Sequence, residues 1–190
     1  MAKLDDLERV EVRSSNALRA WLMANHGQSE SIWLVRFKKA SPHYLAYEEM
    51  VRQALCFGWI DSVPRKLDDE RTMTLLSPRE AGSAWSGINK RHIADLESEG
   101  LIAAPGRAAV ERAKMDGSWT FLDDVERLEK PADLLAAFRG TSGALDGYNA
   151  FPPSSQRGNL EWIKQAKTPE TRARRIATTV GAAAKGKRVP

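Results

Sequence analysis

The chain has 190 residues, of which 42% are hydrophobic and 28% are charged, which is ordinary for one soluble globular domain. No apolar run approaches the roughly 18 residues of a membrane-spanning helix, and acids stand where a signal peptide would have its apolar core. The single cysteine excludes an internal disulfide framework and permits a reducing compartment, and no secretory signal is visible, so we expect a cytoplasmic protein.

The net charge of +4 is unevenly distributed. Residues 163–190 carry eight bases and one acid, a net +7, so the preceding residues carry −3 from 21 bases and 24 acids. A basic end can bind nucleic acid or an anionic membrane surface, but it also occurs for solubility alone. Nucleic acid would bind through Arg172, Arg174 and Arg175, and the −3 charge of the main body argues against this alternative.

The first part of the chain predicts a helix, a strand and a second helix. Ser14 or Ser15 can cap a helix that ends at Gly27. Residues 31–38 predict a central strand, because both faces of the strand are apolar at its start. The second helix is expected over 47–57, with acids in its first turn, where the helix dipole favours negative charge.

Two β-prone runs follow, residues 59–66 and 71–76, joined by the acidic segment 67–70. This pattern predicts a β-hairpin. Pro64 removes a backbone donor, so its strand should lie at a sheet edge or contain a bulge. Pro78 should end the second run.

The rest of the chain predicts helices only. Capping residues, prolines and glycines place their starts near Ser86, Pro105, Pro131, Thr141, Ser154 and Pro169. The fold class is therefore α+β, with a small antiparallel sheet of about three strands in the N-terminal half, covered by helices, and an all-helical C-terminal half. We expect a single domain over residues 1–184, an internal boundary at the loop 121–131, and a basic disordered tail over 185–190.

Few catalytic or metal-binding patterns are present. His26, His43 and His92 lack metal-ligand spacing, and neither a Gly-rich phosphate loop nor a nucleophile elbow occurs, so we expect no metal and no cofactor. Cys56 lies near a helix C-terminus, which favours a buried filler over a nucleophile. We assign no catalytic residue, and an enzyme that uses Asp61 or Cys56 remains an alternative.

The stretch 56–90 combines large aromatic side chains with charge more densely than any other part of the chain. We interpret it as a surface that binds a small anionic or aromatic ligand or a partner peptide, in a non-enzymatic protein. The tryptophans would form walls, the bases would supply charge, and the acid and the amide would orient the ligand. The candidate residues are Trp59, Asp61, Arg65, Lys66, Arg79, Trp85, Asn89 and Lys90.

Two of these positions also have a purely structural interpretation. By strand alternation Asp61 shares a face with Arg65, so it is either the polar floor of a pocket or half of a salt bridge to Arg65 or Arg36. Trp85 directly precedes a helix start. It either borders an anion site at the helix N-terminus or covers the sheet edge beside a Ser86 cap.

Several ordered motifs resemble the YdeI/OmpD-associated family, also called bacteriocin-protection proteins. They are Cys56-Phe57-Gly58-Trp59-Ile60-Asp61, Ser77-Pro78-Arg79, Trp85-Ser86, Asn89 and the segment from Ala166 to Ile176. The resemblance spans nearly the whole chain, with departures mainly over residues 121–151. It implies tolerance of bacteriocins or cationic peptides and a protein partner in envelope stress, and it supplies no catalytic residues.

Overall fold

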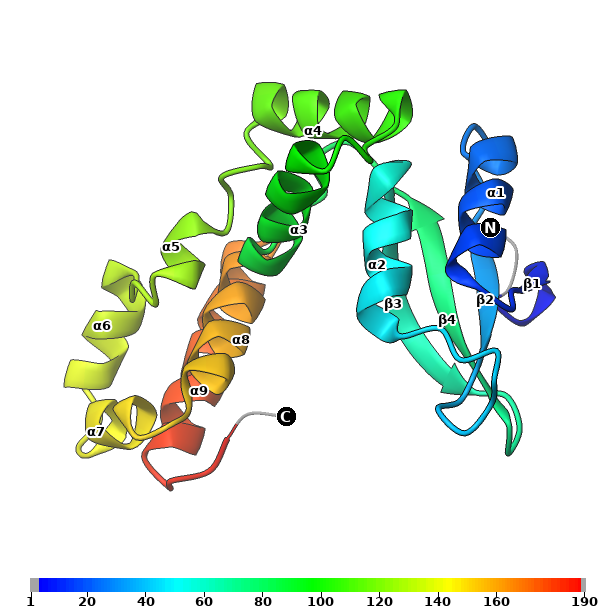
Figure 1. Cartoon of the computed structure of the whole chain (residues 1–190). Helices are drawn as coiled ribbons and strands as arrows, with labels where there is room; N and C mark the ends of the chain where they lie inside the picture. The colour runs from blue at the N-terminus through cyan, green and yellow to red at the C-terminus, as the bar shows by residue number, and fades with distance from the viewer. Residues whose placement is uncertain (1–3, 189–190) are drawn as a thin grey trace. The chain divides into compact units, whose positions relative to one another are not determined.

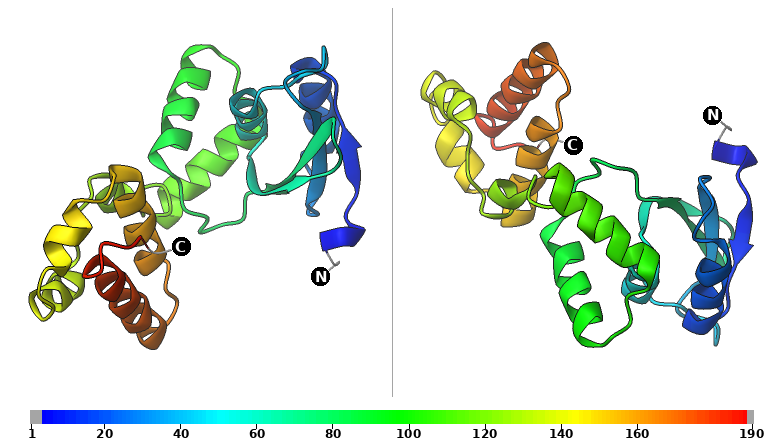
Figure 2. Two further views of the ribbon diagram at one scale, coloured as in Figure 1. Left: turned by 90° about the horizontal axis from the view of Figure 1, so that it is seen from below. Right: turned by 90° about the horizontal axis from the view of Figure 1, so that it is seen from above.

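The computed structural model describes residues 4–188, shown in Figures 1 and 2. The chain divides into two compact units, one that ends at Thr120 and one that begins at Phe121. This division coincides with the start of the loop 121–131 that the sequence marked as an internal boundary. That residues 1–184 act as a single domain stays a prediction.

The first unit is built on a four-stranded mixed sheet with the strand order β1-β2-β4-β3. Its strands are β1 (Arg9–Glu11), β2 (Ile32–Phe37), β3 (Trp59–Lys66) and β4 (Arg71–Pro78). β1 pairs with β2 in parallel, and the two remaining pairs are antiparallel. The α+β class is confirmed, whereas the prediction of about three antiparallel strands is corrected to four strands with one parallel pair.

The predicted hairpin forms, and Pro64 explains an irregularity in it. β3 lies at the edge of the sheet, and its register to β4 shifts between Asp61 and Pro64. Proline cannot donate a hydrogen bond to the sheet, so it is tolerated at such edges and bulges. β2 lies inside the sheet, as its two apolar faces predict.

Two helices cover one face of the sheet, α1 (Ser15–Asn25) and α2 (Tyr47–Cys56) (Figure 1). The Ser14 side chain caps α1 by accepting a hydrogen bond from the backbone N–H of Ala17. Leu18 and Leu22 from α1 pack with Leu34 of β2 in the main core of the unit, which stabilises the sheet and its helices by removing apolar surface from water.

The opposite face of the sheet carries a smaller apolar cluster of Trp33, Val35, Met73 and Leu75. The chain before β1 approaches this cluster, because the Trp33 Nε1–H donates to the Leu4 carbonyl at 2.6 Å. The first unit is completed by α3 (Gly87–Ser98) and α4 (Ala104–Asp116). The Ser86 side chain caps α3, as expected.

In the described part of the second unit, all regular secondary structure is helical. Its helices are α5 (Asp123–Glu126), α6 (Ala132–Arg139), α7 (Ala144–Asn149), α8 (Pro153–Lys164) and α9 (Pro169–Ala183). Thr168 caps α9 with its side chain, and Pro169 occupies the first turn, as the sequence predicts. The sequence predicts a loop over 121–131, and the structure forms the four-residue helix α5 within it.

The predicted disordered tail begins just after α9. The backbone N–H groups of Lys185, Gly186 and Lys187 donate to the Ala182 and Ala183 carbonyls, so a hydrogen-bonded turn with a left-handed Gly186 closes the end of that helix. Residues 189–190 of the predicted tail lie outside the described residues.

Candidate functional site

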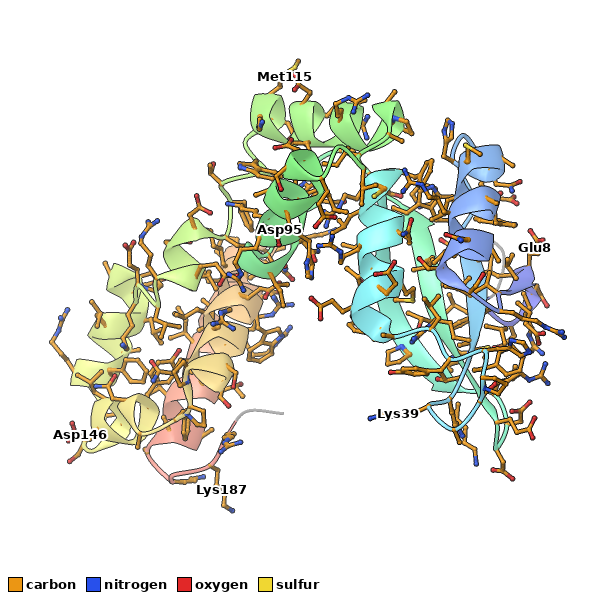
Figure 3. The ribbon with its side chains drawn as sticks, viewed as in Figure 1. Glu8, Lys39, Asp95, Met115, Asp146 and Lys187 are labelled. Atoms are coloured by element: carbon orange, nitrogen blue, oxygen red, sulfur yellow. The ribbon has the colours of Figure 1, made fainter. Side chains whose placement is uncertain are left out.

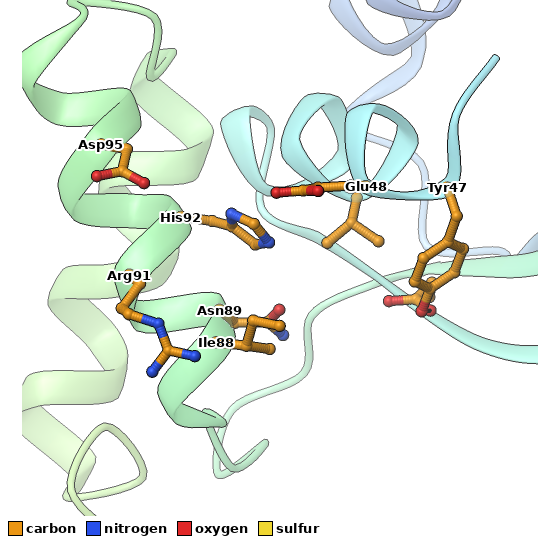
Figure 4. Close-up of a pocket in the computed structure, with 9 residues that line it drawn as sticks. Tyr47, Glu48, Ile88, Asn89, Arg91, His92 and Asp95 are labelled. Atoms are coloured by element: carbon orange, nitrogen blue, oxygen red, sulfur yellow. Dashed lines mark hydrogen bonds between the residues drawn. The ribbon is translucent and has the colours of Figure 1, made fainter.

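A pocket of about 470 Å³ lies between α2, β3 and α3 in the first unit (Figure 4). We call it the α2–β3–α3 pocket. It is lined by Tyr47, Glu48, Val51, Asp61, Ile88, Asn89, Arg91, His92 and Asp95. Its volume falls in the range of small-molecule sites, and its wall combines apolar side chains with a few polar groups, as ligand sites do.

Helical spacing brings most of this wall together. On α2, Tyr47, Glu48 and Val51 lie within one turn, and on α3 the lining residues from Ile88 to Asp95 recur at intervals of one turn. Residues three or four apart share one helix face. Each helix therefore directs its lining residues toward the other helix, as Figure 4 shows for His92 and Glu48.

Asp61 is held by a hydrogen bond from α2. The Tyr47 hydroxyl donates to the Asp61 carboxylate, which closes one end of the pocket. Burial, the hydrogen bond to Asp61 and the negative charge of Asp61 together raise the pKa of the Tyr47 phenol to about 12. Tyr47 is therefore a poor proton donor for catalysis at neutral pH and a stable hydrogen-bonding group.

Two buried arginines, Arg36 and Arg79, interact electrostatically with Asp61. Arg36 donates to the Leu45 carbonyl at 2.9 Å, and Arg79 donates to the Ala84 carbonyl at 3.1 Å. Burial lowers the pKa of Arg36, and it lowers the pKa of Arg79 to about 10, while the charge of Asp61 raises both. Neither arginine forms a salt bridge among residues 4–188, so Asp61 balances their charge from a distance.

The predicted salt bridge between Asp61 and Arg65 does not form. The register shift between Asp61 and Pro64 breaks the strand alternation on which that prediction rested. Arg65 lies instead above the ring of Trp33, 4.6 Å from its centroid, and pairs with Asp5 at 2.7 Å. Asp61 and Arg65 therefore belong to different environments.

Trp59 and Trp85, which we expected as walls of a surface site, are core residues. Their exposed fractions are 0% and 1%, and neither lines the α2–β3–α3 pocket. Trp59 packs edge-on against Trp21, and Trp85 lies under the guanidinium of Arg79 at 3.7 Å. Large aromatic side chains contribute most to stability when buried, which explains this placement.

The remaining predicted bases also lie outside the pocket. Lys66 pairs with Asp69 at 2.8 Å in the hairpin turn, and Lys90 lies 5.4 Å from the ring centroid of Trp119. Of the eight predicted site residues, the pocket contains Asp61 and Asn89. That these eight residues bind a ligand stays a prediction.

The three arginines proposed to bind nucleic acid differ in their contacts with other protein groups. Arg172 pairs with Asp133 through two hydrogen bonds of 2.6 and 2.9 Å. Arg175 donates to the Trp162 carbonyl, and its guanidinium lies 5.1 Å from the centroid of the Trp162 ring. Arg174 is exposed. Because two of the three already have protein partners, they do not form an open row of phosphate contacts.

The remaining candidate features are a cysteine nucleophile, a metal site and a membrane-spanning helix. Cys56 is buried, and burial raises the pKa of its thiol, which favours the unreactive protonated form. No cluster of three or more metal-ligating side chains occurs among residues 4–188. Within the same residues, no helix has both the length and the apolar character to cross a membrane.

Sequence reasoning missed most of the pocket. Tyr47, Glu48, Arg91 and Asp95 were not singled out, and His92 was considered only as a metal ligand. The available signal was the helical spacing of Ile88, Asn89, His92 and Asp95, which places polar side chains on one face of α3. Their meeting with α2 depends on tertiary packing.

The fold and the pocket define a small α+β unit with a ligand-sized cavity, joined to an all-helical unit. The chain belongs to the family described as Domain of unknown function (DUF8412), whose model matches residues 10–109. Residues 127–186 match the family described as Bacteriocin-protection, YdeI or OmpD-Associated. The resemblance to that family is thus confirmed for this part of the second unit. No curated protein and no solved structure matches the chain.

The two matches limit how much of the chain resembles the bacteriocin-protection family. The motifs from Cys56 to Asn89, which we compared with the bacteriocin-protection family, fall within the residues that match the other family. Conversely, residues 127–151 were expected to depart from the bacteriocin-protection family and lie inside its match.

Proposed function

We propose that this chain is a non-enzymatic binding protein whose first unit holds a small ligand, or one side chain of a partner peptide, in the α2–β3–α3 pocket. The observation that carries the proposal is the convergence of Asp61, Asn89 and His92 on one ligand-sized cavity beside Val51 and Ile88. Such a mixture binds a ligand by its apolar body and orients it by its polar groups.

The absence of enzymatic activity is part of the proposal. Tyr47 has a raised pKa and donates to Asp61, and Cys56 is buried with a raised pKa, so neither side chain is an activated nucleophile. His92 lines the pocket without a hydrogen-bonded nucleophile among residues 4–188. These features support recognition of a ligand over its chemical conversion.

The cellular role that we propose is tolerance of bacteriocins or related peptide toxins in the cytoplasm, with a protein partner in envelope stress. The family description of residues 127–186 supports this role. A strain that lacks the gene should become more sensitive to bacteriocin, and expression of the full chain should restore tolerance. Fractionation beside a cytoplasmic marker tests the location. Unchanged sensitivity would contradict this role.

The pocket is tested by a thermal-shift screen of small molecules against the full chain. Ile88 is 54% exposed at the pocket wall, so Ile88→Trp should fill the pocket with little effect on stability. We expect it to abolish the shift that a ligand produces in the unsubstituted protein.

Met115→Trp is the matched control, because Met115 is exposed on α4 and does not line the pocket (Figure 3). A ligand whose shift survives Ile88→Trp, or is lost equally in both variants, would place binding elsewhere. A screen in which no compound shifts the unsubstituted protein would contradict the proposal itself.

A further inference from the structure

The α2–β3–α3 pocket is lined by net negative charge, whereas a site for an anionic ligand would need positive charge. Three carboxylates line it, those of Glu48, Asp61 and Asp95, against one base, Arg91. With His92 neutral, these side chains carry a formal charge of −2. No salt bridge among residues 4–188 involves any of the three carboxylates.

The three carboxylates are not equivalent. Asp61 accepts a hydrogen bond from Tyr47 and balances the buried Arg36 and Arg79. Glu48 and Asp95 are exposed, one on each of the two helices that face each other across the pocket. Arg91 lies one helical turn before Asp95 and offsets only part of this negative charge. An acidic end of the pocket therefore lies between α2 and α3.

His92 supplies an independent indication of a ligand. Its side chain is only 8% exposed, and Figure 4 shows its ring directed into the pocket between α3 and α2. Among residues 4–188, the ring nitrogens have no hydrogen-bond partner. These nitrogens are not among the fully buried side-chain atoms without a partner, so they are open to the pocket, where a ligand can hydrogen-bond with them.

We propose that the ligand carries a primary ammonium group, held by Glu48, Asp95 and His92, with an aliphatic stem against Val51 and Ile88. The inference rests on the proposed function of the pocket and assigns its ligand class. An ammonium group has three N–H donors and no acceptor, which matches two carboxylates and one imidazole. Hydrogen bonds between oppositely charged groups are about twice as strong as neutral ones. The group can belong to a free alkylamine or to a lysine side chain of a peptide.

The test compares three probes of equal length on the full chain: butylammonium, butyrate and butanol. Amide chemical shifts, followed by NMR at increasing probe concentration, report where each probe binds and how tightly. We expect butylammonium to perturb amides of α2 and α3 at the pocket and to bind more tightly than butanol, and butyrate to bind most weakly. Butyrate or butanol binding as tightly as butylammonium would overturn the inference.

Variants locate the ammonium group. Glu48→Gln and Asp95→Asn should each weaken butylammonium binding about tenfold, because each removes one charge-assisted hydrogen bond. His92→Phe keeps a ring of similar shape and should weaken binding by removing the third acceptor. Glu97→Gln on α3 is the control for net charge, because Glu97 is exposed and does not line the pocket. An equal loss in Glu97→Gln and Asp95→Asn would overturn the assignment.

The outcomes separate this inference from the proposed function. If no probe perturbs the pocket and the ligand screen also fails, both are overturned. If butyrate or butanol binds there and butylammonium does not, the pocket binds ligands and only the ammonium assignment fails. An end-blocked lysine peptide identifies the source: tighter binding than butylammonium indicates a peptide side chain, and exclusion of the peptide indicates a free amine.

Discussion

The Tyr47 hydroxyl on α2 donates a hydrogen bond to the Asp61 carboxylate on β3 and so connects the helix to the edge strand of the sheet. Burial, this bond and the charge of Asp61 together raise the pKa of Tyr47 to about 12. Asp61→Asn should lower that pKa, because the negative charge that disfavours tyrosinate is gone.

The pKa of Tyr47 should nevertheless stay above 10 in Asp61→Asn, because burial, the largest cause, remains. Ultraviolet absorbance of tyrosinate during an alkaline titration measures it, and Tyr47→Phe identifies which transition belongs to this residue. Identical titrations of Asp61→Asn and the unsubstituted chain would show that the bond does not control the phenol.

Stability of the second unit should fall at alkaline pH because of Tyr148. This phenol is fully buried and donates to the Gln156 carbonyl at 2.9 Å, and burial raises its pKa from 10 to about 12. The unfolded chain therefore loses this proton first. The stability due to the neutral phenol is complete below pH 10 and is lost as pH rises to about 12, with an expected decrease of about 2–3 kcal/mol.

Urea unfolding followed by circular dichroism between pH 9 and pH 12 measures this decrease, because that range runs from below the ordinary tyrosine pKa of 10 to the raised value of about 12. Tyr148→Phe should be less stable at neutral pH, because it lacks the hydrogen bond, but should show a shallower alkaline decrease. Equal slopes for the two proteins would contradict the buried environment of Tyr148.

Two glycines are required where a backbone from elsewhere in the chain lies close to a helix. A Cβ on Gly106 of α4 would overlap the Cys56 carbonyl, and one on Gly147 of α7 would overlap the Ala183 carbonyl. We expect Gly106→Ala and Gly147→Ala to lower the free energy of unfolding by about 1–3 kcal/mol, despite the better helix propensity of alanine.

Gly158→Ala in α8 is the matched control, because a Cβ there meets nothing within 4 Å. It should raise the free energy of unfolding by up to about 1 kcal/mol, since alanine favours the helix. Chemical denaturation of the three variants measures both effects. Stabilisation by all three substitutions would show that the two close approaches are absent.

The buried Arg79 should contribute to stability through packing more than through charge. Its Nε and one terminal nitrogen have no hydrogen-bond partner, while its guanidinium covers Trp85. Arg79→Met keeps most of the volume and removes the cost of the buried charge, so we expect a change within about 1 kcal/mol. Arg79→Ala should destabilise by about 2 kcal/mol or more, because it leaves a cavity beside Trp85.

Urea denaturation of the two Arg79 variants gives this comparison directly. Equal, large losses in both would mean that the charge itself stabilises the fold, through Asp61 or a bound water. The hydrophobic replacement thereby tests whether the charge of Arg79 itself contributes to stability.

Local patterns were sufficient to predict most elements of the fold. Ser14, Ser86 and Thr168 cap helices where the sequence places them, and Pro64 lies in an irregular edge strand. These features depend on neighbouring residues only. The three-residue strand β1 was missed, because its pairing with β2 is made across the intervening helix α1, and three residues carry too little pattern of their own.

The candidate site was harder to predict than the fold, because it depends more on contacts between distant parts of the chain. Asp61 and Asn89 were predicted and line the pocket, but the predicted walls Trp59 and Trp85 are buried in the core. Their size and apolar character, which suggested a binding surface, are the same properties that favour burial.

The sequence by itself determined the class of the fold, the helix caps, the edge position of Pro64 and the concentration of aromatic residues and charge between residues 56 and 90. Only the tertiary structure decided which of those side chains share a cavity. The packing of α3 opposite α2 brings His92, Glu48 and Asp95 to one pocket, and the bulge in β3 separates Arg65 from Asp61. Both outcomes depend on contacts between elements far apart in the chain, which periodicity within one element does not encode.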